Sequence, residues 1–385
     1  MKHVLFIAGW CDPFGDFIKE HAYAISTRHK VSYVYVEFIK SNKHLPFKID
    51  IHKEQRERTQ LYFVKIFSPL RRFGLFEFLC KVGYNKVIKE IGAQQPIHIC
   101  HVNVRTPITE VVPTLAILRT IPIVLTEHSS FYHYGLQQTF SGEALQLEKD
   151  RVTSWLNQPA IKVIMPVSAQ LSSVLHQSWG VDASRLVVVP NVAAPEFTYK
   201  EKKEHTTLHI VLLAIWKAPK NPMLLAKALT LLSPEERQKI AIHWMGAGPL
   251  LDEVKLYLQE HAPEVSVTYP GIVYDRKQVA AALQQADVLV HPSDAENLPC
   301  VIIESLCCGT PVVSYQLNGI PELVDASNGF LLPPGNYTEL ANVLRKFIQN
   351  KKSFNTRVIS EMASNRYSHE AIAHAFDAVY TRVTQ

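Results

Sequence analysis

Two glutamates eight residues apart carry the clearest chemistry in this sequence. Glu296 and Glu304 flank Pro299, and proline is favoured in the first turn of a helix, so we expect a helix to begin there. Glu296 then lies in the preceding loop, and Glu304 lies more than one turn inside the helix. A helix N-terminus offers free main-chain N–H groups and partial positive charge, which suit a phosphate. The carboxylates suit sugar or ribose hydroxyls, although two surface glutamates at a solvated helix start are the alternative.

Two lysines are the next candidates for binding a phosphate. Lys217 and Lys220 directly follow an apolar strand and precede a helix expected from about Pro222. Loops at the carboxyl ends of strands are where open α/β sheets bind ligands. The alternative for both residues is a solvated loop lysine.

The surrounding pattern alternates between short apolar strands and amphipathic segments. This alternation predicts parallel sheets with crossover helices, an α/β fold class. The first series of expected strands comprises residues 4–8, 31–36, 97–102, 121–126, 163–167 and 186–189. The second series comprises residues 208–213, 240–245, 265–269, 288–291, 311–314 and 329–331. Residues 195–207 are polar and carry like charges, which indicates a linker between two domains.

Length and composition agree with two ordinary domains. The chain has 385 residues, more than one core usually serves, with 47% hydrophobic and 19% charged residues. The six cysteines form no C-x-x-C pair, and no Cys and His spacing typical of a metal site occurs, so we expect no bound metal. With no signal sequence or run of 18 apolar residues, we expect a cytoplasmic protein.

The wider sequence around the two glutamates resembles a known family. Residues 287–324 read Asp-Val-Leu-Val-His-Pro-Ser, the stretch holding both glutamates, Gly-Thr-Pro-Val-Val and Gly-Ile-Pro-Glu-Leu-Val. Together with Thr-Glu-His-Ser at 126–129 and Trp-Met-Gly-Ala-Gly-Pro at 244–249, they resemble the family 4 glycosyltransferases. The resemblance implies the GT-B fold, two Rossmann-like domains facing across a cleft. It places an acceptor-binding domain at 1–195, a nucleotide-sugar-binding domain at 196–368, and a helix at 369–385 crossing back to the first domain.

The resemblance also implies roles on the donor side. Glu304 would bind the ribose, Glu296 would hold the transferred sugar, and Lys220 would neutralise the diphosphate. The family usually has an arginine where this chain has Ile215 or Trp216, and Lys217 could replace its charge. The remaining donor-binding candidates are Asn297, Leu298, Pro299 and Cys300 beside the sugar and diphosphate, and Val273 beside the base. Gly246 and Gly248 resemble a family turn whose role is more often structural.

On the acceptor side the resemblance singles out one histidine and one glycine. His128 ends an apolar strand and would lie beside the donor sugar, where it could steady the reacting centre; a structural histidine is the alternative. Gly15 would belong to a loop that closes over the diphosphate, since glycine permits close backbone approach. We therefore expect Glu296, His128 and Lys220 to be the catalytic residues.

The implied activity is a retaining, hexosyl-type transfer without a metal cofactor. The donor would be a UDP- or GDP-linked sugar, and the acceptor a glycan or lipid-linked molecule in cell-surface polysaccharide or glycolipid synthesis. No carboxylate nucleophile is evident, which favours same-face displacement with the departing phosphate accepting the proton. A sugar-nucleotide epimerase with this fold and a non-catalytic sugar-binding protein are the alternatives.

One region is more basic than the rest of the chain. The net charge is only +5, but residues 40–90 hold twelve Lys or Arg and five Asp or Glu, interleaved with aromatic residues. This composition suits an anionic membrane surface, and a core helix with a solvated basic face is the alternative. No nucleic-acid-binding module accompanies the charge, so we expect no nucleic acid partner.

Overall fold

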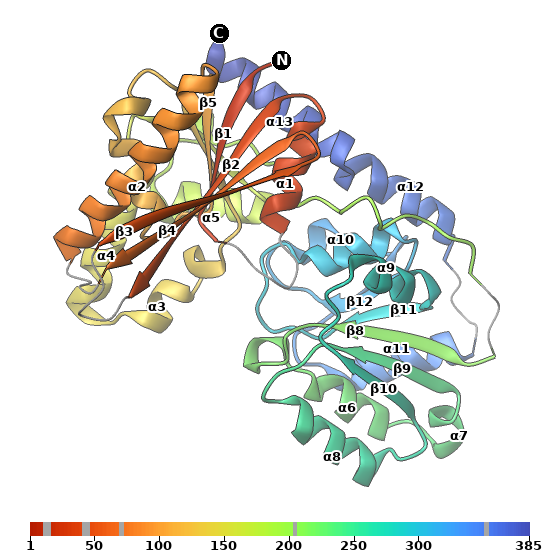
Figure 1. The fold of residues 1–385 in the computed structure, drawn as a ribbon. Helices are drawn as coiled ribbons and strands as arrows, with labels where there is room; N and C mark the ends of the chain where they lie inside the picture. Colours follow the sequence, from red (N-terminus) through yellow and green to blue (C-terminus); the bar gives the residue numbers. More distant parts are fainter. Residues whose placement is uncertain (11–16, 41–46, 69–72, 203–205, 350–353) are drawn as a thin grey trace. The chain divides into compact units, whose positions relative to one another are not determined.

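The computed structural model describes the whole chain except residues 11–16, 41–46, 69–72, 203–205 and 350–353 (Figure 1). The chain divides into two compact units. Unit 1 comprises Met1–Pro190 together with His369–Gln385, and unit 2 comprises Asn191–Ser368. No helix within these described residues is both long enough and apolar enough to cross a membrane.

Unit 1 is built on a seven-stranded sheet of order β3-β4-β2-β1-β5-β6-β7. Its strands are β1 (His3–Ala8), β2 (Lys30–Lys40), β3 (Lys48–Arg56), β4 (Thr59–Ser68), β5 (Ile99–Asn103), β6 (Ile123–Glu127) and β7 (Ile161–Pro166). Its helices are α1 (Phe17–Ser26), α2 (Phe73–Gln94), α3 (Gly135–Thr139), α4 (Gly142–Leu156), α5 (Ala169–Trp179) and α13 (His369–Thr384). Short 3₁₀ turns occupy Thr109–Thr114, Ala116–Leu118, Ser130–Tyr132 and Ala183–Arg185. Strand β1 is buried along its whole length, which explains its unbroken apolar sequence.

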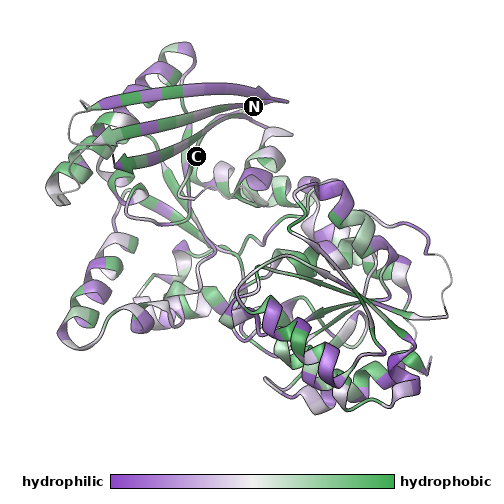
Figure 2. Cartoon of the chain, turned by 60° about the horizontal axis from the view of Figure 1, so that its bottom comes forward, coloured by the Kyte–Doolittle hydropathy of each residue, from purple (hydrophilic) through white to green (hydrophobic). Residues whose placement is uncertain are grey.

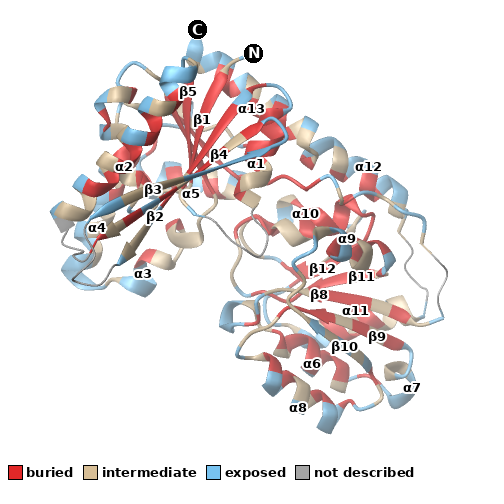
Figure 3. Ribbon diagram, viewed as in Figure 1, coloured by how far each residue is buried: buried red, intermediate tan, exposed pale blue. Residues whose placement is uncertain are grey.

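The basic region contains a β-hairpin that the sequence reading missed. Strand β3 pairs antiparallel with β4, from Lys48 opposite Phe67 to Arg56 opposite Thr59. The other strands of this sheet pair in parallel. Strand β3 forms the exposed edge, whereas β1 is buried along its length and β2 is buried mainly in its first half (Figure 3). In the described part of residues 40–90, the chain forms strands β3 and β4 and most of helix α2, so the alternative of a core helix with a basic face applies to α2, whose Leu79, Cys80, Tyr84, Val87 and Ile88 are buried.

Helix α13 completes the core of unit 1 although it lies at the end of the chain. It packs against α1, and its Phe376 and Tyr380 are fully buried. Tyr380 Oη lies 2.7 Å from Nδ1 of His101, and Asp377 lies 3.1 Å from Nε2 of His29. Apolar burial supplies most of the attachment, and these polar contacts fix the position of the helix.

Unit 2 is built on a six-stranded parallel sheet of order β10-β9-β8-β11-β12-β13. Its strands are β8 (Leu208–Leu213), β9 (Ile240–Met245), β10 (Ser266–Gly271), β11 (Val288–His291), β12 (Val312–Tyr315) and β13 (Gly329–Leu332). Its helices are α6 (Met223–Thr230), α7 (Pro234–Arg237), α8 (Leu251–His261), α9 (Arg276–Gln285), α10 (Cys300–Cys307), α11 (Tyr337–Ile348) and α12 (Thr356–Tyr367). Two 3₁₀ turns lie at Ala218–Lys220 and Ile320–Glu322. Apolar residues gather on the strands and polar residues on the outward helix faces (Figure 2).

One strand expected from the sequence does not form. Residues 186–189 make only an isolated bridge between Leu186 and Ile164, although Val187 and Val189 donate main-chain hydrogen bonds toward β7. Pro190 follows directly, and proline cannot donate a hydrogen bond to a ladder, so the pairing stops. The two-sheet α/β class expected from the alternating pattern is confirmed.

Candidate functional site

The helix between the two glutamates begins one residue later than the sequence predicts. Helix α10 starts at Cys300, and Pro299 is its N-cap with extended backbone angles (φ −69°, ψ 122°). Glu296 lies in the preceding loop, as expected, and Glu304 is buried inside the helix. No main-chain hydrogen bond from the N–H of Cys300 or Val301 occurs among the described residues, so the first turn keeps the donors typical of a helix start.

Glu296 is the centre of a charged, largely buried cluster. Nε2 of His291 lies 2.9 Å from its carboxylate, and the ammonium of Lys220 pairs with the same oxygen. Asn318 donates to its main-chain carbonyl oxygen at 2.5 Å. Burial alone would raise the pKa of Glu296, but the contacts with His291 and Lys220 outweigh it and lower the pKa to about 2. The group is therefore an ionised carboxylate beside a cation.

The loop that carries Lys220 is fastened on two sides. On one side Pro219 O accepts from the Ser293 hydroxyl at 2.7 Å and from the Asp294 main-chain N–H at 2.8 Å. Asn221, with a left-handed φ of 37°, donates to the Asp294 carboxylate at 2.5 Å. Lys220 is thereby joined to the loop that holds Glu296. Lys217 is exposed and precedes the same turn.

On its other side this loop lies against the turn at Gly246 and Gly248. A Cβ on Gly246 would lie 1.8 Å from Ala214 O, and one on Gly248 would lie 2.2 Å from Trp216 O. Trp216 is buried in the core, and its Nε1 donates to Met245 O at 3.0 Å. Of the two residues at the family's arginine position, Trp216 is therefore a core residue, and Ile215 is 41% exposed. The structural role expected for both glycines agrees with this crowding.

Glu304 is held by a residue that the sequence reading did not select. Arg276, the first residue of α9, donates to the Glu304 carboxylate at 2.7 Å. The guanidinium also lies over the Phe197 ring, 4.6 Å from its centroid. A carboxylate with one arginine partner keeps further acceptor positions, which hydroxyl groups could use.

The remaining donor-side candidates occupy the two loops next to these charges. Leu298 is buried, and its main-chain oxygen accepts from Asn191 Nδ2 at 2.7 Å. The oxygen of Asn297 accepts from the Gly319 main-chain N–H at 3.1 Å. Val273 lies in the half-exposed segment between β10 and α9, three residues before Arg276. Gly15 lies outside the described residues.

In unit 1, His128 directly follows β6, at the edge of the sheet where parallel strands end. Its Nε2 lies 3.1 Å from Oδ1 of Asn103, the last residue of β5. The Phe17 ring packs edge-on against the imidazole, with centroids 4.9 Å apart. The imidazole of His128 therefore has a defined orientation. It is half-buried and lies at the end of a strand, where the sequence predicted it.

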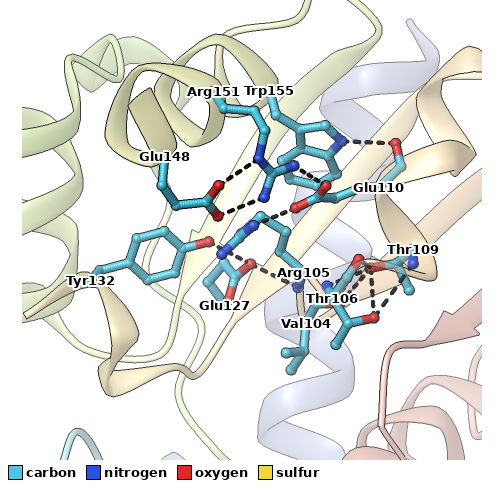
Figure 4. A network of polar contacts seen from close by, with 10 residues as sticks. All are labelled: Val104, Arg105, Thr106, Thr109, Glu110, Glu127, Tyr132, Glu148, Arg151 and Trp155. Atoms are coloured by element: carbon cyan, nitrogen blue, oxygen red, sulfur yellow. Dashed lines mark hydrogen bonds and ion pairs between the residues drawn. The ribbon is translucent and has the colours of Figure 1, made fainter. Parts of the chain in front are cut away.

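A buried carboxylate precedes His128. Glu127 is fully buried, and burial raises its pKa despite the nearby Arg105 guanidinium. It accepts hydrogen bonds from the Arg105 main-chain N–H and from the Tyr132 hydroxyl, both at 2.9 Å (Figure 4). These contacts join the segments after β5 and β6 on either side of His128.

The network in Figure 4 continues outward from Arg105. The Arg105 guanidinium pairs with Glu110, which also pairs with Arg151 of α4. Arg151 in turn binds Glu148 through two nitrogens, at 2.6 and 2.8 Å. Trp155 Nε1 donates to Glu110 O at 2.9 Å. The network therefore holds helix α4 against the segments around His128.

Several residues of the two clusters were missed by sequence reasoning. His291 ends an apolar strand, as His128 nearly does, and that signal could have found it. Arg276 and Asn318 are 28 and 22 residues from their partners, and no local pattern links them. Glu127 and Arg105 likewise depend on neighbouring strands. Among the described residues, no group of three or more His, Cys, Asp or Glu side chains could hold a metal ion.

Comparisons with known families account for most of the chain. A family model described as "Glycosyltransferase Family 4" matches residues 33–197. A second, "Glycosyl transferases group 1", matches residues 196–363. The two matches adjoin, and together they run from residue 33 to residue 363.

Curated relatives match more locally. A protein of Escherichia coli (strain K12) described as a colanic acid biosynthesis glycosyltransferase, WcaL, is 35% identical over 112 residues, which are 27% of each chain. The sulfoquinovosyl transferase SQD2 of Arabidopsis thaliana is 23% identical over 288 residues, 70% of this chain and 53% of that protein. The matched part thus spans about a quarter of one relative and about half of the other.

Solved structures are similar over nearly the full length. Anabaena Alr3699/HepE, solved in complex with UDP, has a TM-score of 0.73 at 18% identity and covers 99% of this chain and 100% of its own. The lipopolysaccharide outer core galactosyltransferase WaaB, in its apo form, has a TM-score of 0.69 at 14% identity and covers 99% of both chains. These similarities establish the fold. With its two α/β sheets and the adjoining family matches, the chain belongs to the family 4, or group 1, glycosyltransferases of the GT-B fold.

Proposed function

We propose that this protein is a retaining glycosyltransferase that moves a hexosyl group from a UDP- or GDP-linked sugar to a glycan or lipid-linked acceptor. The reaction would serve the synthesis of a cell-surface polysaccharide or glycolipid. The observation that carries the proposal is the cluster of Lys220, His291 and Glu296 beside the first turn of α10. Family membership and the UDP bound to the similar Anabaena protein support it.

The cluster supplies both signs of charge that a nucleotide sugar needs. Lys220 is 25% exposed, so its ammonium can reach an incoming diphosphate. The start of α10 adds N–H donors and the positive end of the helix dipole. In the free protein Lys220 pairs with Glu296, and we propose that the diphosphate takes over Lys220. The released Glu296 carboxylate then accepts hydrogen bonds from the sugar, while His291 keeps it in place.

Glu304 serves the nucleoside in this proposal. Its carboxylate would accept hydrogen bonds from the ribose, with Arg276 fixing its orientation. The loop around Val273 would lie beside the base, and Asn297 to Cys300 beside the sugar and diphosphate. Lys217 would add positive charge from its exposed position next to the Lys220 turn.

The chemical step we propose is same-face displacement. The bond between the anomeric carbon and the diphosphate oxygen breaks as the acceptor oxygen bonds to that carbon. The acceptor's proton passes to the leaving phosphate. Lys220 and the α10 N-terminus stabilise the charge that develops there, so no divalent cation is required. His128 would steady the reacting centre. Incubation with EDTA should leave turnover unchanged, and restoration of lost activity by Mg²⁺ or Mn²⁺ would contradict this step.

A nucleotide-sugar screen tests the proposal most directly. Thermal shift with UDP- and GDP-linked sugars identifies the donor, and isothermal titration with UDP and GDP follows. We expect Lys220→Ala to weaken diphosphate binding about 10- to 100-fold, since a charge-assisted hydrogen bond contributes about 1.5–3 kcal/mol. Lys217→Ala, in the same loop but more exposed, should weaken it less. Equal affinity in Lys220→Ala and wild type would remove Lys220 from the donor site.

Substitutions of the two glutamates should have different effects in the same experiments. Glu304→Ala should weaken nucleotide binding, whereas Glu296→Ala should mainly depress turnover. Unchanged behaviour of the double variant would refute both roles. Analysis of the product then distinguishes transfer from the alternatives, because an epimerase returns an altered nucleotide sugar and a binding protein returns the donor intact.

We further propose that unit 1 docks on the cytoplasmic face of an anionic membrane through residues 40–90. Within the described part of this region, Phe47 and Phe78 are 46% and 60% exposed, and Lys48 follows Phe47 directly. Exposed aromatic rings beside lysines suit a lipid headgroup layer. The chain should float with liposomes containing anionic lipid and not with neutral ones. Equal behaviour with both would reject the membrane proposal.

A further inference from the structure

Two buried side chains of unit 1, His21 and Asn103, form a chain of hydrogen bonds with the half-buried His128. Asn103 Oδ1 lies 3.1 Å from His128 Nε2, and Asn103 Nδ2 lies 3.2 Å from Nδ1 of His21 in helix α1. The other nitrogen of His21, Nε2, lies 3.4 Å from the main-chain oxygen of Pro190. Both His21 and Asn103 are fully buried.

The carbonyl of Pro190 sets the direction of every bond in this chain. A carbonyl oxygen only accepts, so His21 Nε2 must carry a proton. Burial lowers the pKa of His21 to about 4, so the ring is neutral near pH 7 and its Nδ1 has a lone pair. Asn103 must therefore donate through Nδ2 to His21 Nδ1. Its Oδ1 then accepts from His128, which requires a proton on His128 Nε2.

The opposite arrangement is disfavoured at the Pro190 end. If the Asn103 amide were turned over, His21 would need its proton on Nδ1. Its Nε2 lone pair would then face the lone pairs of Pro190 O at 3.4 Å, and the hydrogen bond would be lost. In a fully buried ring no water replaces that bond, so the loss of about 1–3 kcal/mol corresponds to a roughly 5- to 150-fold ratio between the two arrangements.

Asn103 has little freedom to leave this position. Its main-chain oxygen accepts from Gly9 at 2.8 Å, and the next N–H, that of Val104, donates to Thr126 O at 2.9 Å. Val104 has a φ of 70°, a left-handed conformation that is rare for a β-branched residue. Such a conformation persists only where its surroundings fix it. The backbone is thus bent directly after the residue that contacts His128.

We propose that Asn103 and His21 are positioning residues that favour the Nε2–H tautomer of His128 whenever its ring is neutral. In this tautomer His128 Nδ1 can accept a hydrogen bond from a sugar or acceptor hydroxyl but cannot donate one. The catalytic consequence rests on the proposed function, because it assumes that His128 acts in sugar transfer. The tautomer itself does not depend on that assumption. The Phe17 ring, 4.9 Å from the imidazole, helps to fix the ring plane.

Nitrogen NMR of the intact, unliganded chain labelled with ¹⁵N-histidine tests the tautomer. The His128 signals are assigned by their loss in His128→Gln. We expect the neutral form of wild-type His128 to carry its proton on Nε2. A neutral ring with its proton on Nδ1 would overturn the proposal. This spectrum decides the question even if a variant of Asn103 fails to fold.

Substitution of Asn103 supplies the second arm of the test. Asn103→Leu removes both hydrogen bonds, and we expect the His128 nitrogen shifts to move toward a mixture of tautomers. His101, whose nitrogens lie 2.7 Å from Tyr380 Oη and Thr126 Oγ1, serves as the internal reference. Ser32→Ala is the matched control, because it removes a partner 2.9 Å from another buried histidine, His3. Unchanged His128 nitrogen shifts in Asn103→Leu would overturn the proposed role of Asn103 in selecting the tautomer.

Kinetic measurements distinguish a failure of this inference from a failure of the proposed function. If the chain transfers a sugar, Asn103→Leu should lower kcat about tenfold or more, with the KM for the nucleotide sugar changed less than about threefold. The donor contacts proposed above lie in unit 2, which explains that split. Absence of turnover with every nucleotide sugar would remove the proposed function, while the wild-type spectrum would still decide the tautomer.

Discussion

Glu296 shows how a buried carboxylate remains charged in this protein. Its side chain is 11% exposed, and an isolated glutamate so placed would favour the neutral form. The imidazole of His291 and the ammonium of Lys220 reverse that preference. A buried group with such partners is a candidate for function, although buried ion pairs also occur in purely structural networks. Its contribution to stability is measurable separately from any activity.

The lowered pKa of Glu296 predicts a dependence of stability on pH. The pKa is about 2 in the folded protein, compared with an ordinary value of 4.5, so the stabilisation is present above pH 4.5 and is lost as the pH falls toward 2. Between pH 6 and pH 3, wild type should lose about 2 kcal/mol of stability through this group. Glu296→Gln should lack that loss, as measured by hydrogen exchange of unit 2 peptides at both pH values.

The control for this measurement is a carboxylate in the same unit that lies in solvent. Asp252 has a side chain that is 94% exposed, and Asp252→Asn should reproduce the wild-type dependence on pH. If Glu296→Gln and wild type lost the same stability between pH 6 and pH 3, the contacts with Lys220 and His291 would not hold the Glu296 charge in solution.

At the scale of elements, the sequence predicted the helices and strands that are determined by residues close together in the chain. Helix α10 and the strand before it follow from Pro299 and from the apolar run that ends at His291. The hairpin of β3 and β4 was missed because its turn, Glu57-Arg58, lacks the usual Gly or Asn, although Glu57 adopts a left-handed φ of 52°. The contact of Arg276 with Glu304 requires α9 beside α10, and only the folded chain shows that.

The turn after β9 should decide where Lys220 lies. In Gly248→Ala the added Cβ would lie 2.2 Å from Trp216 O and 2.6 Å from Trp216 C, so the loop of residues 214–220 must move. We expect a loss of stability of more than about 2 kcal/mol and weaker binding of UDP or GDP. Urea unfolding and isothermal titration measure the two effects.

Gly335 offers a matched comparison for Gly248. It also has a positive φ, 73°, but an added Cβ would meet no atom within 4 Å. Gly335→Ala should therefore cost only the left-handed conformation, about 1–2 kcal/mol, and leave nucleotide affinity unchanged. Equal effects of the two substitutions on affinity would show that backbone conformation, and not crowding against Trp216, explains the glycine at position 248.

At the scale of the whole molecule, the last helix belongs to the first unit. Helix α13 begins directly after unit 2 ends, yet its buried residues complete the core around α1 and β5. Phe376 is fully buried, with its ring centroid 5.3 Å from that of His21 and 5.1 Å from that of His101. The stability of unit 1 therefore depends on residues that follow unit 2 in the sequence, while unit 2 is continuous.

This division predicts a one-sided loss of stability. Phe376→Ala leaves a cavity beside His21 and His101, and removal of a buried phenylalanine side chain typically costs about 3–5 kcal/mol. Hydrogen exchange followed by mass spectrometry should show faster exchange in β1, β5 and α1 and unchanged protection in β8 to β12. Thr381→Ala, at an exposed position of the same helix, should leave both units unchanged. Loss of protection in unit 2 of Phe376→Ala would mean that α13 stabilises the molecule as one cooperative body, since a cavity confined to unit 1 cannot otherwise open the amides of the second sheet.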